Sequence, residues 1–234
     1  MNIDRRSKMG VVINVNPSKK GLSQTQDQRH KLDNCDTTHI LLKIETQSLH
    51  QKLDNNIFLQ NLLHPSLTKE TLAQALKGFY IAYNSLREHG ILKACSQLNV
   101  IDFKQLPYNL WLTADLTRLN QKPIYHLNKQ TYLPQSEAEV LGCLYVILGS
   151  SMGSARIANA LKNHDDKIIQ DIQFFSKVAE NSSNFRLLLN EIELKTSHPI
   201  AQKACINAAK STFNIFIESF EIVMATHNNG KVFV

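Results

Sequence analysis

The sequence predicts an all-α protein, a single-domain bundle of about seven or eight helices. Three observations indicate this class. Apolar residues recur at helical spacing along most of the chain, and helix-starting or helix-breaking residues separate the periodic stretches. Clear alternation of apolar and polar residues, which is typical of strands, is confined to the stretch VVINV at 11–15. We see no internal repeat, inter-domain linker or low-complexity tract.

The first half of the chain contains four helical patterns. The first begins near residue 38, where any of three neighbouring polar residues can cap it, and its inward face is formed by Leu42, Thr46, Leu49, Leu53 and Ile57. The second begins near Pro65 or Thr68 and is expected to stop at Gly90. Shorter patterns follow at 92–98 and 103–119, and Pro107 is expected to open or bend the latter.

The second half follows segment 120–135, the best candidate for an internal loop because it holds Pro123 and Pro134. A helix is then expected from Ser136 to Lys162. Three more helical patterns run over 166–178, over 182–195 and from Pro199 to about 225, where Pro199 fits a first-turn position. Residues 38–234 are therefore expected to form one helical domain.

The positive charge is concentrated at the N-terminus. The net charge is +6 overall, and residues 1–31 hold seven Lys or Arg against two Asp, so the rest of the chain carries only +1. This basic segment has no aromatic residue on which bases could stack, which argues against nucleic-acid binding. Residues 1–37 are therefore interpreted as a basic polar tail, largely disordered.

No apolar run approaches the ~20 residues of a membrane-spanning helix, and the start MNIDRRSKMG lacks the apolar segment of a secretory signal. We therefore expect no membrane span and a cytoplasmic location. The four cysteines, at 35, 95, 143 and 205, lie far apart with no CxxC pair. A zinc site or redox dithiol is therefore not favoured, and free thiols are expected in a reducing compartment.

His50 is the first candidate for chemistry. Thr46, Leu53 and Ile57 share its helix face, so its imidazole is expected to point toward the core, either as a hydrogen-bonded core residue or as a metal ligand. Lys43 lies two turns earlier on nearly the same face, about 10 Å away along the axis. Such a lysine either extends to solvent or meets the anionic edge of a flat ligand centred on His50.

Two glycines interrupt the helical pattern at 136–162. Gly149 and Gly153 are four residues apart, as are Ser150 and Ser154, so one side of the helix lacks bulk for more than a turn. Each interior glycine costs about 1 kcal/mol relative to alanine. Two interpretations remain open: another helix packs closely here, or the backbone forms one wall of a slot for a planar ligand.

Two stretches together resemble the haem oxygenase family, closest to its bacterial form: LLKIETQSLHQKLDNNIFLQNL at 41–62 and YVILGSSMGSARI at 145–157. The resemblance implies that His50 is the proximal ligand of the haem iron and that Lys43 binds a propionate. It also implies that Gly149, Ser150 and Gly153 form the catalytic distal segment. Animal members carry an aspartate where this chain has Ser150.

Two stretches nearer the C-terminus extend the resemblance, which runs from about 38 to 220. FRLLLNEIE at 185–193 places Arg186 where a basic residue meets a propionate, and AAKSTFNIF at 208–216 places Phe213 where an aromatic ring lines the pocket. Asp54, one turn after the histidine, is a conceivable hydrogen-bond partner that would fix the imidazole tautomer. The alternative for Asp54 is a salt bridge to a surface lysine.

The resemblance implies oxidative cleavage of haem to biliverdin, carbon monoxide and ferrous iron, with haem as both substrate and cofactor. Electrons would come from a ferredoxin, flavodoxin or flavin reductase, since the chain has no GxGxxG dinucleotide fingerprint. Three other functions stay open. They are a haem or tetrapyrrole carrier that does not cleave its ligand, a thiaminase-type hydrolase using Cys143, and a helical interaction protein without a ligand.

Overall fold

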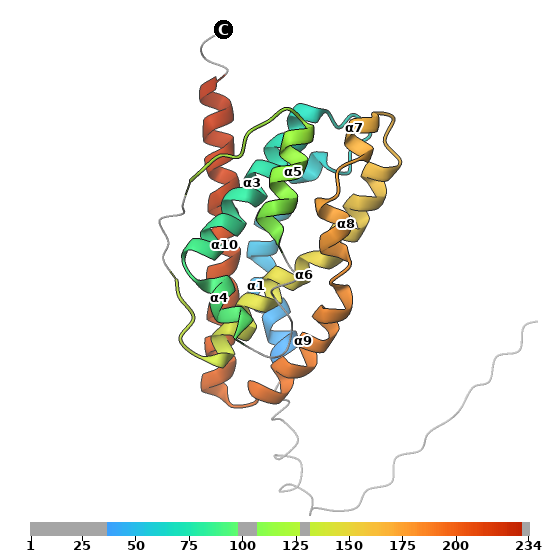
Figure 1. The fold of residues 1–234 in the computed structure, drawn as a ribbon. Helices are drawn as coiled ribbons and strands as arrows, with labels where there is room; N and C mark the ends of the chain where they lie inside the picture. The colour runs from blue at the N-terminus through green and yellow to red at the C-terminus, as the bar shows by residue number, and fades with distance from the viewer. Residues whose placement is uncertain (1–36, 98–106, 127–131, 231–234) are drawn as a thin grey trace, which may run out of the picture. The chain divides into compact units, whose positions relative to one another are not determined.

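The computed structural model describes residues 37–97, 107–126 and 132–230, and this part of the chain is all α-helical, with ten helices and no strand (Figure 1). The predicted all-α bundle is confirmed. The expected tail lies, apart from Thr37, outside the described residues. The helices are α1 (Thr38–Asp54), α2 (Ile57–Asn61), α3 (Lys69–Glu88), α4 (Ile91–Ser96), α5 (Tyr108–Arg118), α6 (Glu137–Lys162), α7 (Lys167–Gln170), α8 (Phe174–Ala179), α9 (Ser182–Lys195) and α10 (Pro199–Gly230).

The helix starts follow the polar residues and prolines in the sequence. The Thr68 side chain accepts a hydrogen bond from the backbone N–H of Thr71 and so caps α3. Ser136 and Glu139 form a reciprocal capping box at the start of α6. Helix α5 begins directly after Pro107, and Gly90 adopts a left-handed conformation (φ 76°) between α3 and α4. Part of the predicted helix at 103–119 lies outside the described residues.

The most extensive helix contact in the bundle is between α6 and α10. Helix α10 also packs against α1 and α3, while α6 also packs against α8 and α9 (Figure 1). Helix α6 is long and apolar enough to cross a membrane by length and composition, which the sequence pattern did not suggest. However, 56% of its most apolar window is buried inside the domain, as expected for the core helix of a bundle.

Two glycines let α10 approach its neighbours closely. A Cβ atom on Gly142 of α6 would lie 2.0 Å from the backbone carbonyl oxygen of Cys205 on α10. A Cβ atom on Gly78 of α3 would lie 2.5 Å from the ring of Phe220, which is also on α10. Because real Cβ atoms do not approach other atoms so closely, both glycines are required by the helix packing.

The predicted helix at 166–178 is wrong as a single element, since the chain forms α7 and α8 with a break at 171–173. A buried carboxylate from another helix explains the break. Asp115 of α5 accepts hydrogen bonds from the backbone N–H groups of Gln173 (3.0 Å) and Phe174 (2.7 Å). These are N–H groups that a new helix start leaves unpaired. Arg118 donates to the same carboxylate at 2.6 Å.

Asp115 also predicts a pH dependence of stability. Burial raises its pKa above the ordinary value of 3.8, against the opposing effect of the hydrogen bonds from Phe174 and Gln173 and of Arg118. The folded state therefore binds the proton more tightly than the unfolded state, so this carboxyl's contribution to stability falls as pH rises above about 3.8. We expect the stability difference between wild type and Asp115→Asn to shrink with rising pH, measured by urea unfolding between about pH 3.5 and 7. A difference that stays constant over this range would contradict the assignment.

Candidate functional site

His50 lies on α1 with its imidazole turned outward: 62% of the side chain is exposed. The expectation that it points toward the core is wrong, because Leu42 and Thr46 alone fill the buried face of this part of α1. Ile57, assigned to the same face, instead begins α2 and is 49% exposed. The short break after Asp54 therefore rotates the pattern relative to a continuous helix.

The His50 ring has two defined neighbours. Its Nδ1 atom lies 2.8 Å from Oδ2 of Asp54, one turn further along α1. The ring also meets Phe213 of α10 edge to face, with centroids 5.8 Å apart. Within the described residues, the opposite ring nitrogen, Nε2, has no hydrogen-bond partner. A carboxylate at Nδ1 with Nε2 left open is the arrangement found at histidines that bind metals.

Helix α1 is held in place mainly by α9 and α10. The Glu193 carboxylate accepts the backbone N–H groups of Thr38 (3.1 Å) and His39 (2.8 Å), which fixes the first turn of α1 to the end of α9. Two ion pairs then join α1 to α10, namely Glu45 with Lys210 and Lys52 with Glu221. In contrast, α1 makes little direct helix-to-helix contact with α6.

The two predicted anchoring cations are exposed. Lys43 lies on α1 and Arg186 on α9, and neither forms an ion pair within the described part of the chain. Three other cations on these helices and on α10 are already neutralised, since Lys52, Lys195 and Lys210 each lie within 3 Å of a glutamate, whereas Lys203 of α10 forms no ion pair within the described residues. Lys43 and Arg186 therefore remain available to an anionic ligand.

The glycine face of α6 is not a close helix contact. A Cβ atom on Gly153 would meet no described atom within 4 Å, and one on Gly149 would meet only the ring of Phe185, at 3.4 Å. The close approach that one interpretation placed here occurs instead at Gly142, seven residues earlier. The space beside Gly153 is therefore open.

The Ser150 side chain already makes a hydrogen bond within the bundle. Its hydroxyl donates to the carbonyl oxygen of Ile147 at 2.7 Å. Ser150 also opposes the rise that burial causes in the pKa of Tyr83 on α3, and Tyr83 is stacked on Tyr108, with centroids 4.1 Å apart. The Ser150 side chain therefore adjoins the aromatic core between α3 and α5.

Two aromatic side chains lie beside the glycine segment of α6. The ring centroid of Tyr145, four residues before Gly149, lies 5.8 Å from that of Phe185 on α9, and the Phe185 ring is the neighbour of Gly149. Sequence reasoning missed Tyr145 and Phe185 because both read as ordinary apolar-face residues. The available signal was position, since Tyr145 lies one turn before Gly149 and Phe185 directly precedes Arg186.

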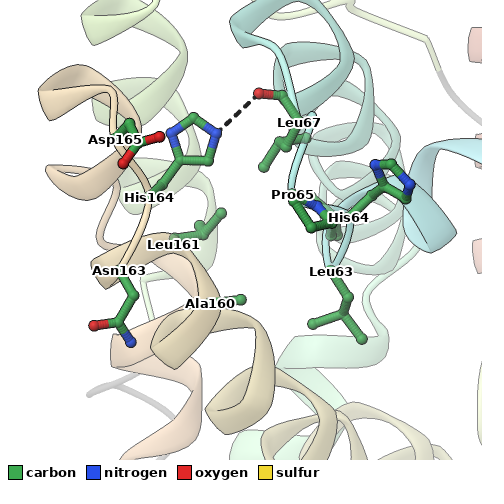
Figure 2. Close-up of a pocket in the computed structure, with 10 residues that line it drawn as sticks. Leu63, His64, Pro65, Leu67, Ala160, Leu161, Asn163, His164 and Asp165 are labelled. Carbon is green, nitrogen blue, oxygen red and sulfur yellow. Dashed lines mark hydrogen bonds between the residues drawn. The ribbon is translucent and has the colours of Figure 1, made fainter.

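A cavity of about 280 Å³ lies elsewhere, between segment 62–67 and the end of α6 with the residues that follow it (Figure 2). It contains none of the predicted site residues. His164 spans it: Nε2 lies 3.0 Å from the carbonyl oxygen of Leu67, and Nδ1 accepts the backbone N–H of Asp166 at 3.0 Å. Because both ring nitrogens are occupied, and because the cavity is smaller than most ligand pockets, we interpret it as a structural junction.

The cysteine chemistry required by a hydrolase is not supported. Cys143 is fully buried, and this burial raises the pKa of its thiol to about 11. Only the thiolate is a good nucleophile, and this thiol stays protonated near neutral pH. The geometry therefore favours the histidine and glycine motifs, rather than Cys143, as the functional groups.

Comparisons with known proteins identify the family and the fold. The family model described as Heme oxygenase matches residues 37–222. Three solved structures share the fold. They are heme oxygenase from Neisseria meningitidis in NO- and CO-bound forms (18% identity, TM-score 0.58, covering 81% of this chain and 93% of that one), heme oxygenase-1 from the cyanobacterium Synechocystis in complex with heme (15%, 0.54, 83% and 95%), and heme oxygenase from Leptospira interrogans (20%, 0.53, 79% and 98%). A comparison with curated protein sequences finds no significant match.

Proposed function

The chain belongs to the haem oxygenase family, and on this basis we propose that it cleaves haem oxidatively to biliverdin, carbon monoxide and ferrous iron. The observation that carries the proposal is His50, whose Nδ1 is paired with Asp54 while Nε2 is open and the ring is exposed beside Phe213. When bound, haem supplies the iron that activates dioxygen and the macrocycle that is cleaved. The open space at Gly153 and the two unpaired cations fit a flat, anionic group of this kind.

On the proximal side, Nε2 of His50 would bind the iron. The Asp54 carboxylate accepts a hydrogen bond from the Nδ1–H group, which leaves Nε2 unprotonated and fixes the orientation of the ring. The Phe213 ring packs against the imidazole and excludes water from one side of it. Because α1 is anchored to α9 and α10, the imidazole is held on a rigid support.

On the distal side, Gly149, Ser150 and Gly153 form the second wall. The glycines would let the macrocycle approach the α6 backbone beside the Ser150 hydroxyl. Lys43 and Arg186 would pair with its two propionates and hold it in one orientation.

Electrons come from a separate protein, either a ferredoxin, a flavodoxin or a flavin reductase, since the sequence carries no dinucleotide fingerprint. The proposal includes a cytoplasmic location without a membrane span. The burial of most of the apolar window of α6 supports it.

Hemin titration followed by turnover tests the function. The full chain is expected to develop a Soret band with hemin, and the band should decay in air with ascorbate or a reductase system as biliverdin is released. A band that persists under these conditions would contradict cleavage and favour the carrier. No spectral change on adding hemin would contradict haem binding altogether.

Gly153→Leu is expected to separate binding from stability. The new side chain enters open space, so the folded protein should be as stable as wild type or up to about 1 kcal/mol more stable, because a helix-favouring residue replaces glycine. The same side chain obstructs the proposed haem wall, so hemin affinity should fall at least about 10-fold. Urea unfolding and hemin titration measure the two effects.

The matched control for this variant is Ala155→Leu, which adds a similar side chain to an exposed position on the same helix. It should bind hemin as the wild type does. Equal hemin affinity in Gly153→Leu and Ala155→Leu would contradict a haem-contacting role for Gly153.

Asp54→Ala is expected to weaken hemin binding by about 10- to 100-fold, because the imidazole loses the acceptor that fixes its tautomer and orientation. Equilibrium titration measures this loss. Asp171→Ala is the control, since that exposed aspartate also forms an (i, i+4) pair, with Lys167, but lies outside the proposed site. If the two variants bind hemin equally well, Asp54 does not support the ligand.

A further inference from the structure

The ring of Phe185 lies over one end of the glycine segment of α6. Phe185 is near the start of α9, and its side chain is partly buried. A Cβ atom on Gly149 would lie 3.4 Å from Cε2 and 3.6 Å from Cζ of this ring, whereas one on Gly153 would meet no described atom within 4 Å. The outer end of the ring therefore covers Gly149 and leaves Gly153, one turn further along α6, uncovered.

Only apolar contacts hold the Phe185 ring in this position. The backbone N–H of Phe185 donates to the carbonyl oxygen of Asn181 at 3.2 Å, so its main chain belongs to the first turn of the helix. The ring centroid lies 5.8 Å from that of Tyr145 on α6, at an interplanar angle of 49°. Because a phenylalanine ring carries no polar atom, no hydrogen bond fixes it. The side chain can therefore change rotamer while the backbone of α9 stays in place.

The proposed haem wall requires the space that this ring occupies. Tyr145 lies one turn before Gly149 and Ile157 one turn after Gly153, on the same side of α6, and both have large side chains. Only the glycine segment between them lets a flat group lie against the backbone. A macrocycle of four pyrrole rings is wider than the pitch of one helical turn, about 5.4 Å, so it must cover Gly149 as well as Gly153. The macrocycle and the Phe185 ring cannot both lie on Gly149.

Phe185 directly precedes the cation that is proposed to bind a propionate. Successive residues of a helix point about 100° apart, so the Phe185 ring turns toward α6 while Arg186 is exposed. Both side chains start from the same turn of α9. The ring therefore lies at the edge of the proposed site where Arg186 would meet a propionate.

We propose that Phe185 is a gate, whose ring must turn away from Gly149 before haem reaches the α6 backbone. This inference rests on the proposed function. A gate differs from a residue that only lines the pocket. A lining residue adds contacts to the bound group and so slows its dissociation. A gate lowers the fraction of molecules that can accept the group and so slows its association.

Phe185→Ala and Phe185→Leu test the gate in the full chain. Alanine removes the ring, and leucine keeps an apolar side chain that packs against the core. The contact of one aromatic ring with another corresponds to about a 2- to 10-fold change in an opening equilibrium. Hemin association, followed by stopped-flow absorbance, should therefore be about 2- to 10-fold faster in Phe185→Ala, with a smaller gain in Phe185→Leu. Urea unfolding checks that both variants are folded.

Leu187→Ala is the matched control. Leu187 lies on the same helix, two residues after Phe185, and is 55% exposed on another side of it. This variant also loses a large apolar side chain from α9, but it should leave the association and dissociation rates of hemin unchanged.

Metal-free protoporphyrin separates the gate from iron binding, because it has the same plane and the same carboxylates as haem but no iron for His50. Its association should show the same gain in Phe185→Ala, followed by its fluorescence. A gain with hemin and none with protoporphyrin would place the effect at the iron ligand and would overturn the gate.

The remaining outcomes distinguish the gate from the proposed function. If the wild type binds hemin and Phe185→Ala differs from it in neither rate, or only in faster dissociation, the gate is overturned and the proposed function is unaffected. If only Phe185→Ala takes up hemin, the gate is supported. If neither protein takes up hemin, the proposed function fails and the gate fails with it.

Discussion

His50→Ala should abolish the Soret band that hemin produces with the wild-type chain, or weaken hemin binding by at least about 100-fold. The reason is that His50 supplies the proposed iron ligand, and removal of a partner that only supports a ligand already costs about 10- to 100-fold. The side chain is 62% exposed, so its loss should leave the urea midpoint nearly unchanged. Equilibrium titration of the full chain measures the effect on binding.

His39→Ala is the matched control because His39 lies on the same helix and contributes only its backbone N–H to the contact with Glu193. It should retain the wild-type spectrum and affinity. An unchanged Soret band in His50→Ala would show that another group binds the iron. The proximal assignment, and with it the role of Asp54, would then be wrong.

Gly142→Ala should have the largest effect on stability, a loss of about 3 kcal/mol. The added methyl group would lie 2.0 Å from the carbonyl oxygen of Cys205 and 3.0 Å from the Cβ atom of Ala208. Both atoms belong to α10 close to its backbone, so the helices must move apart. Since α10 also packs against α1 and α3, a shift there disturbs the centre of the bundle. Far-ultraviolet circular dichroism during urea unfolding measures the loss.

Gly153→Ala gives the opposite sign on the same helix. Its methyl group meets no described atom within 4 Å, so the only expected effect is a gain of about 0.5–1 kcal/mol from helix propensity. If the two substitutions change the free energy of unfolding equally, the close approach of α10 at Gly142 is not real. These two substitutions therefore also test which glycine is required by helix packing and which leaves space for a ligand.

The sequence predicted the helices that carry the proposed site residues but not the orientation of His50. The order of the histidine and glycine motifs identified α1 and α6, and the family match confirms the resemblance. The outward turn of His50 could not be predicted, because His50 lies four residues after the buried Thr46 on a continuous helix and is nevertheless left uncovered. Periodicity gives the side of a helix on which a residue lies, and the neighbouring helices decide how far along that side is buried.

The roles of the glycines in α6 could not be predicted from the sequence either. Gly142, Gly149 and Gly153 lie on one helix and look alike in the sequence, yet a Cβ atom would meet the α10 backbone, the Phe185 ring and open space respectively. The residues next to these three glycines in the sequence do not distinguish their roles. The difference comes from which helix lies opposite, and that depends on the whole bundle.

The sequence by itself determined the helices, because capping residues, prolines and apolar spacing act over a few residues: Ser136 starts α6, Gly90 separates α3 from α4, and Pro199 opens α10. Only the tertiary structure decided where the chain breaks between α7 and α8, because the carboxylate that binds the N–H groups of Gln173 and Phe174 comes from Asp115, about sixty residues earlier. A local pattern cannot encode a partner that distant, since only folding of the bundle brings α5 and α8 together.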